Sequence, residues 1–233
     1  MSPLDGRRVA IVGGASGIGA AIAARAAEAG AEVIVAGRRV DRLTPPPGGR
    51  VAAVDLAVEN SVAEFAAEVG PVDVVVSLAA DHANGPVVGL DPAAVHRALD
   101  AKVVGPLLLV KHLAPRMPDD GVVVLFSGVA SRRPSPGLVV MATGNRAVEG
   151  LVDALAVELA PIRVVGVSPG IVDSGAWDGL GAERDGFFAG VAAANPARRV
   201  GTTADLASAT MFAIENPFLT GTTLHVDGGG RLA

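Results

Sequence analysis

Short runs of β-branched residues alternate with Ala-rich segments of helical length along the chain, and this alternation constrains the fold more than any other feature. The strand-like runs occupy residues 8–13, 32–37, 50–55, 72–77, 122–127, 163–168 and 223–226. Such alternation is typical of βαβ units and a parallel sheet. Near-continuous apolar runs are expected of strands that helices cover on both faces. The sequence therefore predicts a Rossmann-type, doubly wound α/β fold with seven strands in a three-layer α/β/α sandwich.

Length and composition limit the number of domains and the classes of function. The chain has 233 residues, of which 50% are apolar, so it can form one domain over residues 1–233. The absence of cysteine excludes disulfides and thiolate metal sites, and we predict no metal site. A net charge of -5 without a basic stripe argues against nucleic acid as a partner. No apolar run reaches the roughly 18 residues of a membrane span, so we expect a cytoplasmic protein without membrane contact.

A glycine-rich turn, VGGASGIG at residues 12–19, directly follows the first predicted strand and begins the first predicted helix. Glycines at 13, 17 and 19 permit a tight turn, a close approach of the backbone to a pyrophosphate, and packing of the helix on the strand. The N-terminus of the helix also favours an anion. An ordinary glycine-rich turn is the alternative, but the strand before it and the helix after it favour a dinucleotide site.

The end of the second predicted strand indicates which dinucleotide binds. Dinucleotide-binding folds usually place an acidic residue there to hold the ribose hydroxyls. In this chain Gly37 occupies the position, and Arg38 and Arg39 follow it. Because two guanidinium groups can pair with a 2′-phosphate, we predict NADP(H) in preference to NAD(H), although both arginines could instead be solvated loop charges. Asp55, at the end of the third strand, either faces the adenine or caps the next helix.

Four further motifs accompany these: SPG at residues 168–170, GVASRRPSPG, AVEGLVDALAVELAP and the C-terminal LTGTTLHVDGGG. With all of these motifs, nearly the whole chain resembles the short-chain dehydrogenase/reductase family. The resemblance implies a strand order of 3-2-1-4-5-6-7, a nicotinamide held near residues 169–174, and a homo-oligomer, either a dimer or a tetramer. The residues expected to contact the cofactor are Gly13, Ala15, Ser16, Gly17, Ile18, Gly19, Arg38, Arg39, Asp55, Leu56, Ala79, Pro169, Gly170, Val172 and Ser174.

The catalytic positions that the resemblance implies carry other residues in this chain. Members of the family use Asn, Ser, Tyr and Lys, and the corresponding positions here are occupied by Lys102, Gly128, Met141 and Asn145. The chain contains no tyrosine, so no displaced phenol can replace the missing one. Positioned acid-base catalysis accelerates reactions by roughly 10²- to 10⁴-fold, and Met141 can supply none of it. A different proton donor is required for carbonyl reduction.

Three residues are candidates for that donor. Lys102 is the first, because a cation has changed places with an asparagine between the two helices, and burial would lower its pKa. The alternative is a lysine that faces solvent or bonds to the backbone. Ser127 precedes the position of the missing serine, but neighbouring strand residues point to opposite faces. His82 lies just after the fourth strand, where open α/β sheets bind ligands, or is simply a solvated loop histidine.

Residues 173–196 form the longest irregular stretch and contain Trp177, Phe187 and Phe188. We predict that this stretch is a short helical flap over the substrate, with Trp177 as either a cover or an anchor. The alignment predicts an apolar pocket lined by Met141, Leu78, Val139 and Trp177, suited to a small hydrophobic carbonyl or alcohol. Arg132 and Arg133 either attract an anionic substrate or form a solvated pair.

Three functions remain open. The first is a divergent NADP-dependent oxidoreductase that uses Lys102, with His82 or Ser127 as further candidates, in place of the usual acid. The second is an enzyme that catalyses a non-redox step, such as a dehydration or isomerisation, on the same scaffold. The third is a non-catalytic NADP-binding sensor or partner subunit. The family resemblance favours the oxidoreductase.

Overall fold

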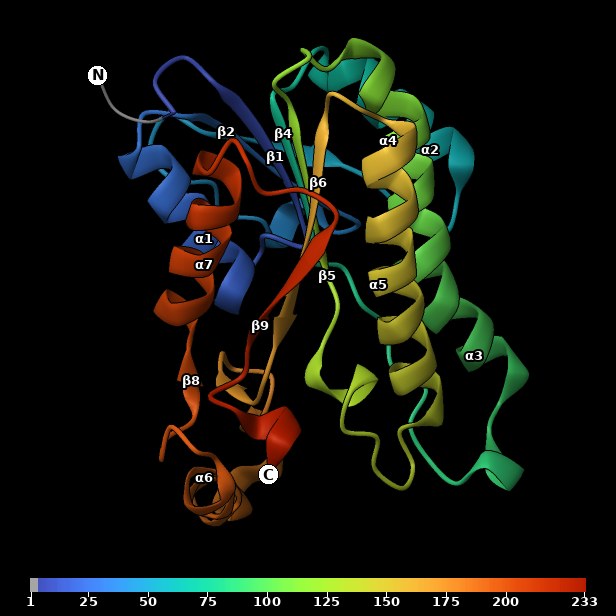
Figure 1. Ribbon diagram of the computed structural model, residues 1–233. Helices are drawn as coiled ribbons and strands as arrows, with labels where there is room; N and C mark the ends of the chain where they lie inside the picture. Colours follow the sequence, from blue (N-terminus) through green and yellow to red (C-terminus); the bar gives the residue numbers. More distant parts are fainter. Residues whose placement is uncertain (1–3) are drawn as a thin grey trace.

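A seven-stranded parallel sheet forms the centre of the computed structural model, which describes residues 4–233 (Figure 1). Its order is β3-β2-β1-β4-β5-β6-β9, and every neighbouring pair is parallel. The predicted fold class and strand order are therefore confirmed, with β9 as the seventh predicted strand. The strands are β1 (Arg8–Val12), β2 (Glu32–Gly37), β3 (Arg50–Ala53), β4 (Val74–Ser77), β5 (Val122–Phe126), β6 (Arg163–Pro169) and β9 (Thr222–Val226).

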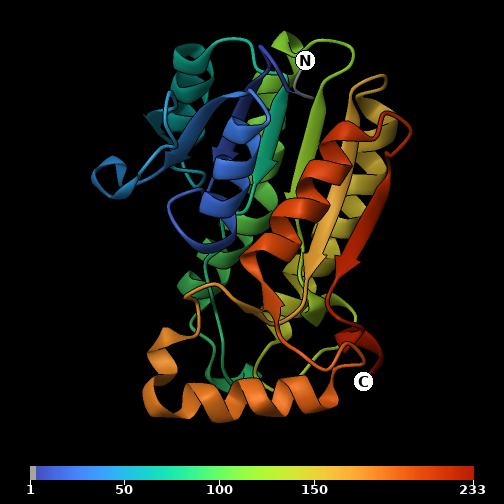
Figure 2. The ribbon, with the colours of Figure 1, turned by 90° about the vertical axis from the view of Figure 1, so that its left-hand side faces the viewer.

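Helices cover both faces of this sheet (Figures 1 and 2). On one face lie α1 (Gly17–Glu28) and α7 (Thr203–Glu215), which pack against each other. On the other face lie α2 (Glu59–Val69), α4 (Gly105–Leu113) and α5 (Val139–Glu158), with α3 (Pro92–Leu99) packed beside α5. Among residues 4–233, no helix combines the length and apolarity that crossing a membrane requires.

The alternation of side chains along each strand builds two hydrophobic cores. Ile11 of β1 packs with Ile22 of α1 and Leu206 of α7 on one face. Its neighbour Val12 packs with Phe65 of α2 on the opposite face. Successive strand residues point to opposite faces, so a continuous apolar run is what a doubly covered strand needs.

Three strands, β1, β3 and β5, end one or two residues earlier than the sequence predicts, and local backbone chemistry explains the ends of β1 and β3. β1 stops at Val12 because Gly13 has a φ of 94°, which leaves the extended conformation. β3 stops at Ala53, and the N–H of Asp55 donates to Ser61 Oγ at 3.0 Å. Both ends lie on the carboxyl edge of the sheet, where ligands bind in open α/β folds.

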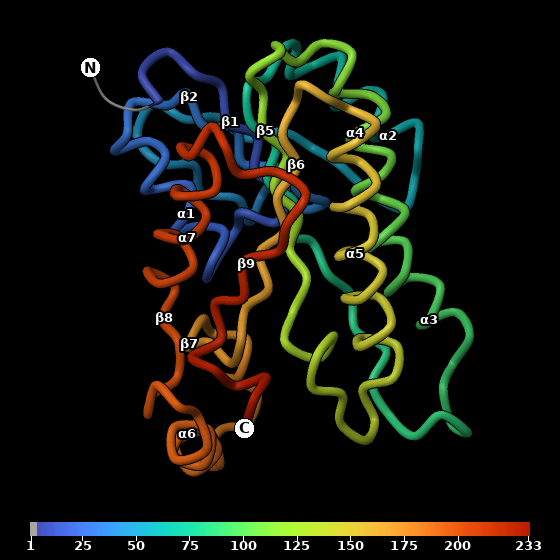
Figure 3. Tube along the Cα trace, viewed as in Figure 1, coloured from blue at the N-terminus to red at the C-terminus, as the bar shows by residue number. Residues whose placement is uncertain are grey.

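A second, two-stranded sheet follows β6 and was not predicted. It pairs β7 (Val172–Asp173) with β8 (Gly201–Thr202), and each strand is too short to show a periodic pattern (Figure 3). Between the two strands the chain forms the 3₁₀ segment η6 (Asp178–Glu183) and the helix α6 (Arg184–Ala194). Figures 1 and 2 show α6 beyond the end of the main sheet, apart from the helical layers. Its role as a substrate flap stays a prediction.

Candidate functional site

The glycine turn between β1 and α1 is packed too closely for side chains. An ideal Cβ at Gly19 would lie 2.4 Å from the carbonyl oxygen of Gly13. At Gly17, which has a φ of 54°, a Cβ would lie 2.6 Å from the carbonyl oxygen of Ser174. At Gly13 it would lie 3.0 Å from the backbone nitrogen of Ala79. The turn, the end of β4 and the loop after β7 therefore meet through their backbones.

A substitution at Gly19 tests this packing. We expect Gly19→Ala to lower the free energy of unfolding by about 1–3 kcal/mol, because the added methyl group meets backbone that cannot yield cheaply. Gly150 in α5 is the matched control, since a Cβ there meets nothing within 4 Å. Gly150→Ala should instead raise stability by about 0.5–1 kcal/mol. Chemical denaturation measures both, and two changes of the same sign would contradict the account.

A cavity of about 550 Å³ adjoins the turn at the carboxyl edge of the sheet. It is lined by these predicted cofactor residues: Gly13, Ser16, Arg38, Arg39, Asp55, Leu56 and Ala79. The structure thus brings together residues from the ends of β1, β2, β3 and β4. Arg97 of α3 also lines this cavity. Sequence reasoning missed it, because nothing in its helical surroundings distinguishes it from a solvated charge.

The charges in this cavity suit an anionic ligand. Arg38 and Arg39 are exposed, and no carboxylate of residues 4–233 lies within ion-pair distance of either guanidinium. Asp55 lines the same cavity, and its Oδ1 accepts a hydrogen bond from the N–H of Ala57 at 3.0 Å. Its side chain therefore closes a turn before α2, whose N-cap residue is Val58. The arginines remain free to pair with a phosphate.

The other predicted cofactor residues lie around this cavity or further along the same edge. Pro169 ends β6, Gly170 lines a second and larger cavity, and Ser174 contacts the glycine turn. Ala15 is exposed in the turn itself. The side chain of Val172 is buried in the core on the α1 and α7 face, so only its backbone is available to a ligand, whereas Ile18 packs against this core and is partly exposed.

Lys102 lies in a short π-helical segment, Asp100–Val104 (η3), which joins α3 to α4. The side chain is buried with 8% of its surface exposed, and its stem faces Gly144 of α5. Its Nζ donates to the backbone carbonyl oxygen of Ser127 at 3.2 Å, which is the backbone bond that the sequence left as an alternative. No carboxylate of residues 4–233 pairs with it. Burial lowers the pKa of Lys102 to about 8. Lys111, the other lysine, is instead exposed and paired with Glu59.

Asn145 and Gly128 fit each other as a pair. An ideal Cβ at Gly128 would lie 2.8 Å from Nδ2 of Asn145, so the amide occupies the space that a side chain at 128 would need. Ser127 Oγ donates to the carbonyl oxygen of Asn145 at 2.9 Å. Oδ1 of Asn145 is buried without a hydrogen-bond partner among the described residues. Lys102, Ser127, Gly128 and Asn145 thus form one contiguous group between the end of β5 and α5.

The remaining catalytic candidate lies apart from this group. His82 is exposed in the loop after β4 and lines neither of the two cavities. Met141, at the position of the missing tyrosine, is half-buried and also lines neither cavity. The structure therefore gives His82 no contact with the groups around Lys102 that would favour it as a proton donor.

A buried carboxylate, which sequence reasoning missed, lies next to this group. Glu149 of α5 pairs with Arg132 and Arg146, each at 2.8 Å, and accepts a hydrogen bond from Ser131. Burial raises the pKa of Glu149, but these hydrogen bonds and positive charges outweigh burial and leave the pKa below its ordinary value. Ser127 Oγ lies 3.4 Å from Oε1 of Glu149. Glu149 holds Arg132 and the loop after β5 against α5.

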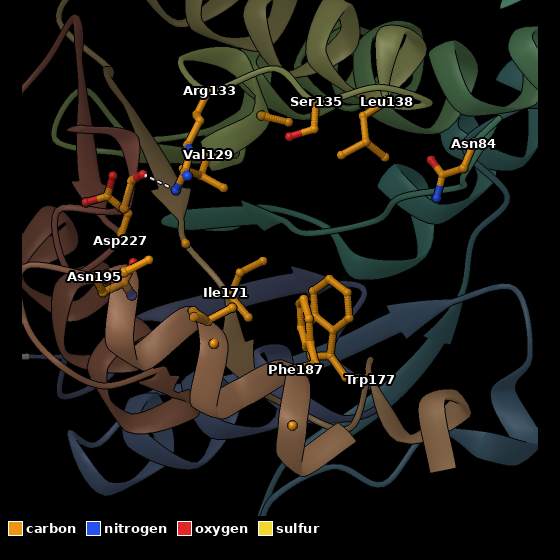
Figure 4. Close-up of a pocket in the computed structure, with 17 residues that line it drawn as sticks. Asn84, Val129, Arg133, Ser135, Leu138, Ile171, Trp177, Phe187, Asn195 and Asp227 are labelled. Atoms are coloured by element: carbon orange, nitrogen blue, oxygen red, sulfur yellow. Dashed lines mark hydrogen bonds between the residues drawn. The ribbon is translucent and has the colours of Figure 1, made fainter. Parts of the chain in front are cut away.

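The larger cavity has a volume of about 660 Å³ and lies between the loop after β5 and α6 (Figure 4). Trp177 lines it, as the sequence suggested, and Phe187, Ile171 and Val129 contribute further apolar surface. Of the other residues predicted for an apolar pocket, Leu78 lines the smaller cavity, while Met141 and Val139 line neither. The predicted pocket is therefore replaced by one whose walls come largely from α6 and the loop after β5.

Comparison with known proteins agrees with this architecture. Residues 13–230 match the family model described as Enoyl-(Acyl carrier protein) reductase. The short-chain reductase protein NovJ of Streptomyces niveus is 33% identical over 246 residues, covering 95% of this chain and 93% of that protein. An uncharacterized short-chain type dehydrogenase/reductase of Sinorhizobium fredii, y4vI, is 30% identical over 97% of this chain, which spans only 43% of that protein. The chain belongs to the short-chain dehydrogenase/reductase family.

Solved structures of short-chain dehydrogenases/reductases superimpose on nearly the whole chain. A small-chain dehydrogenase in complex with NADPH gives a TM-score of 0.87 at 33% identity, covering 98% of this chain and 100% of that one. The MalC reductase/Diels-Alderase of Malbranchea aurantiaca gives a TM-score of 0.91 at 27% identity, covering 100% and 99%. This is an oxidoreductase family that binds a nicotinamide cofactor, and the smaller cavity lies where such folds bind dinucleotides.

Proposed function

We propose that this short-chain dehydrogenase/reductase binds NADP(H) and interconverts a small hydrophobic carbonyl compound and its alcohol, with Lys102 as the proton donor. The observation that carries the proposal is the smaller cavity, where the glycine turn meets two arginines without carboxylate partners. Backbone at the turn offers close approach to a pyrophosphate, and the guanidinium groups suit a 2′-phosphate. The residues present thus fit the adenosine half of NADP.

The protein's own residues would then supply what the cofactor cannot. A bound nicotinamide supplies or takes a hydride, so the chain must provide a proton, an orientation and protection from water. Lys102 holds a proton at Nζ, beside the carbonyl oxygen of Ser127. Lys102 itself lines neither cavity, but its neighbour Ala101 lines the smaller one, and Val129, two residues after Ser127, lines the larger one. A pKa of about 8 lets this ammonium group both keep and release a proton near neutral pH. Trp177 and Phe187 would exclude water from the reacting carbonyl.

Titration of the purified protein with NADPH and, in parallel, NADH tests the proposed function. We expect micromolar affinity for NADPH and at least about tenfold weaker binding of NADH, because only NADPH carries the 2′-phosphate. Calorimetry or cofactor fluorescence measures both affinities. If neither dinucleotide binds, the proposed oxidoreductase function is wrong. Equal affinity for the two would instead refute the NADP preference alone.

A non-redox reaction on the same scaffold is the second candidate. It is favoured by the group around Lys102, which contains no phenol, and by Met141 at the position of the usual tyrosine. The name of MalC, a reductase/Diels-Alderase, couples a reduction with a non-redox reaction in one related protein. A protein that binds NADPH but oxidises none of it with a panel of ketones and aldehydes would favour this candidate, or a non-catalytic NADP-binding sensor or partner subunit.

Self-association is also part of the proposal. Leu107 of α4 and Val157 of α5 expose 45% and 82% of their surfaces on neighbouring helices. Leu107, Leu155 and Leu159 line an apolar groove between these two helices. A homodimer or homotetramer would bury this groove, and sedimentation of the purified protein would measure the number of subunits.

A further inference from the structure

One end of the larger cavity carries an arginine whose charge no carboxylate balances. Arg133, in the loop after β5, lines the cavity, and its Nη1 donates to the carbonyl oxygen of Gly230 at 3.1 Å. Figure 4 shows the side chain of Arg133 near Asp227 and Asn195, opposite the aromatic end of the cavity. No carboxylate of residues 4–233 lies within ion-pair distance of its guanidinium. Its hydrogen bond to a carbonyl leaves other N–H groups for a ligand.

The neighbouring charges are already paired. Asp227 accepts hydrogen bonds from Arg231 Nη1 at 2.7 Å and from the N–H groups of Gly229 and Arg231 at 3.0 and 3.1 Å. Arg132, the residue before Arg133, pairs with Glu149 at 2.8 Å. The polar end of the cavity therefore has a net positive charge that resides on Arg133.

The opposite end of the cavity is aromatic and apolar. The rings of Trp177 and Phe187 are 4.8 Å apart between centroids, and both side chains are only half-buried. Trp177 faces the cavity from the position just before η6 and Phe187 faces it from α6, with Ile171 between them and the polar end (Figure 4). Apolar surface of this kind gains free energy when a ligand removes it from water.

We propose that the larger cavity binds an amphipathic carboxylic acid, whose carboxylate pairs with Arg133 and whose apolar body packs on Trp177 and Phe187. A planar carboxylate matches the fork of N–H donors on one guanidinium. A doubly charged phosphate fits less well, because the one unpaired positive charge at this end, on Arg133, balances only one of its two negative charges. The inference rests on the proposed function for its reaction, and it makes the substrate an oxo or hydroxy acid.

Trp177 is the only tryptophan in the chain, so its fluorescence reports directly on this cavity without cofactor or turnover. We would titrate the full chain with 4-phenylbutyrate and with the neutral 4-phenylbutyramide, which differ mainly in charge. The acid should change the emission of Trp177 and bind about tenfold or more tightly than the amide, as a charge-assisted contact requires. Arg133→Met should remove this preference, and Arg133→Lys should retain part of it.

Arg25→Met is the matched control, because Arg25 is an exposed arginine of α1 that pairs only with Glu28. It removes the same charge and should leave the preference for the acid unchanged. Equal affinities for acid and amide, no response of Trp177 to either, or an unchanged preference in Arg133→Met would each overturn the proposal. Failure of both dinucleotides to bind would overturn the proposed oxidoreductase function and leave this result standing.

Discussion

Replacing Lys102 with methionine should make the protein more stable and, at the same time, nearly inactive. At neutral pH the buried ammonium destabilises the folded state, because its pKa falls from the ordinary 10.5 to about 8 on folding. That pKa difference corresponds to a destabilisation of the folded state by about 3 kcal/mol, which the substitution removes. The substitution also leaves the carbonyl oxygen of Ser127 without its donor, which costs about 1 kcal/mol. We expect Lys102→Met to raise the free energy of unfolding by about 2 kcal/mol at pH 7.

The pH dependence gives the same substitution a second signature. Between about pH 8 and 10.5 the unfolded chain keeps a proton on Lys102 that the folded chain has released, so the stability of the native sequence should rise with pH. Lys102→Met should lack this rise. Denaturant titrations at several pH values measure both effects. A variant that is less stable than the native protein at neutral pH would contradict the burial cost.

The turnover rate of the Lys102 variants distinguishes a lysine that donates the proton from a lysine that is only buried. Loss of a positioned acid should lower the rate of NADPH oxidation with a carbonyl substrate by about 10²-fold or more, with NADPH affinity unchanged. Lys102→Arg should not restore the rate, because a guanidinium keeps its charge but does not release its proton in this pH range. Unchanged turnover in Lys102→Met would rule out Lys102 as the donor.

The double substitution Arg38→Gln, Arg39→Gln should weaken NADPH binding by about 100-fold and leave NADH binding nearly unchanged. Each arginine can form a charge-assisted hydrogen bond with the 2′-phosphate, and the loss of each should cost about tenfold in affinity. The native preference for NADPH should also fall as salt rises, because salt screens exposed charges. Parallel calorimetric titrations with the two cofactors measure the change in preference.

Arg42→Gln is the matched control for the double substitution. Arg42 is exposed in the same loop, in the 3₁₀ segment Val40–Arg42 (η1), but it does not line the cavity. The Arg42→Gln variant should bind both cofactors with the affinities of the native protein. Equal weakening of NADPH and NADH by the double substitution would mean that the arginines support the loop and do not recognise the phosphate.

Much of the fold could be predicted from the sequence, because the signals are local. Continuous runs such as VVVLF in β5 and the glycine turn at residues 12–19 specify a buried parallel strand and a strand-to-helix turn without reference to distant residues. The order of the strands came from the family resemblance. The short pair β7 and β8 could not be predicted, because two-residue strands form only where the tertiary structure brings them together.

The sequence by itself determined the alternation of strands and helices, and with it a glycine turn at the carboxyl edge of the sheet. Only the tertiary structure decided that Lys102 is buried against Ser127, that Asn145 fills the space above Gly128, and that Arg133 and Trp177 share one cavity. Local conformation follows from neighbouring residues, whereas burial and charge pairing depend on residues that are distant in sequence. The chemistry of this site depends on burial and charge pairing.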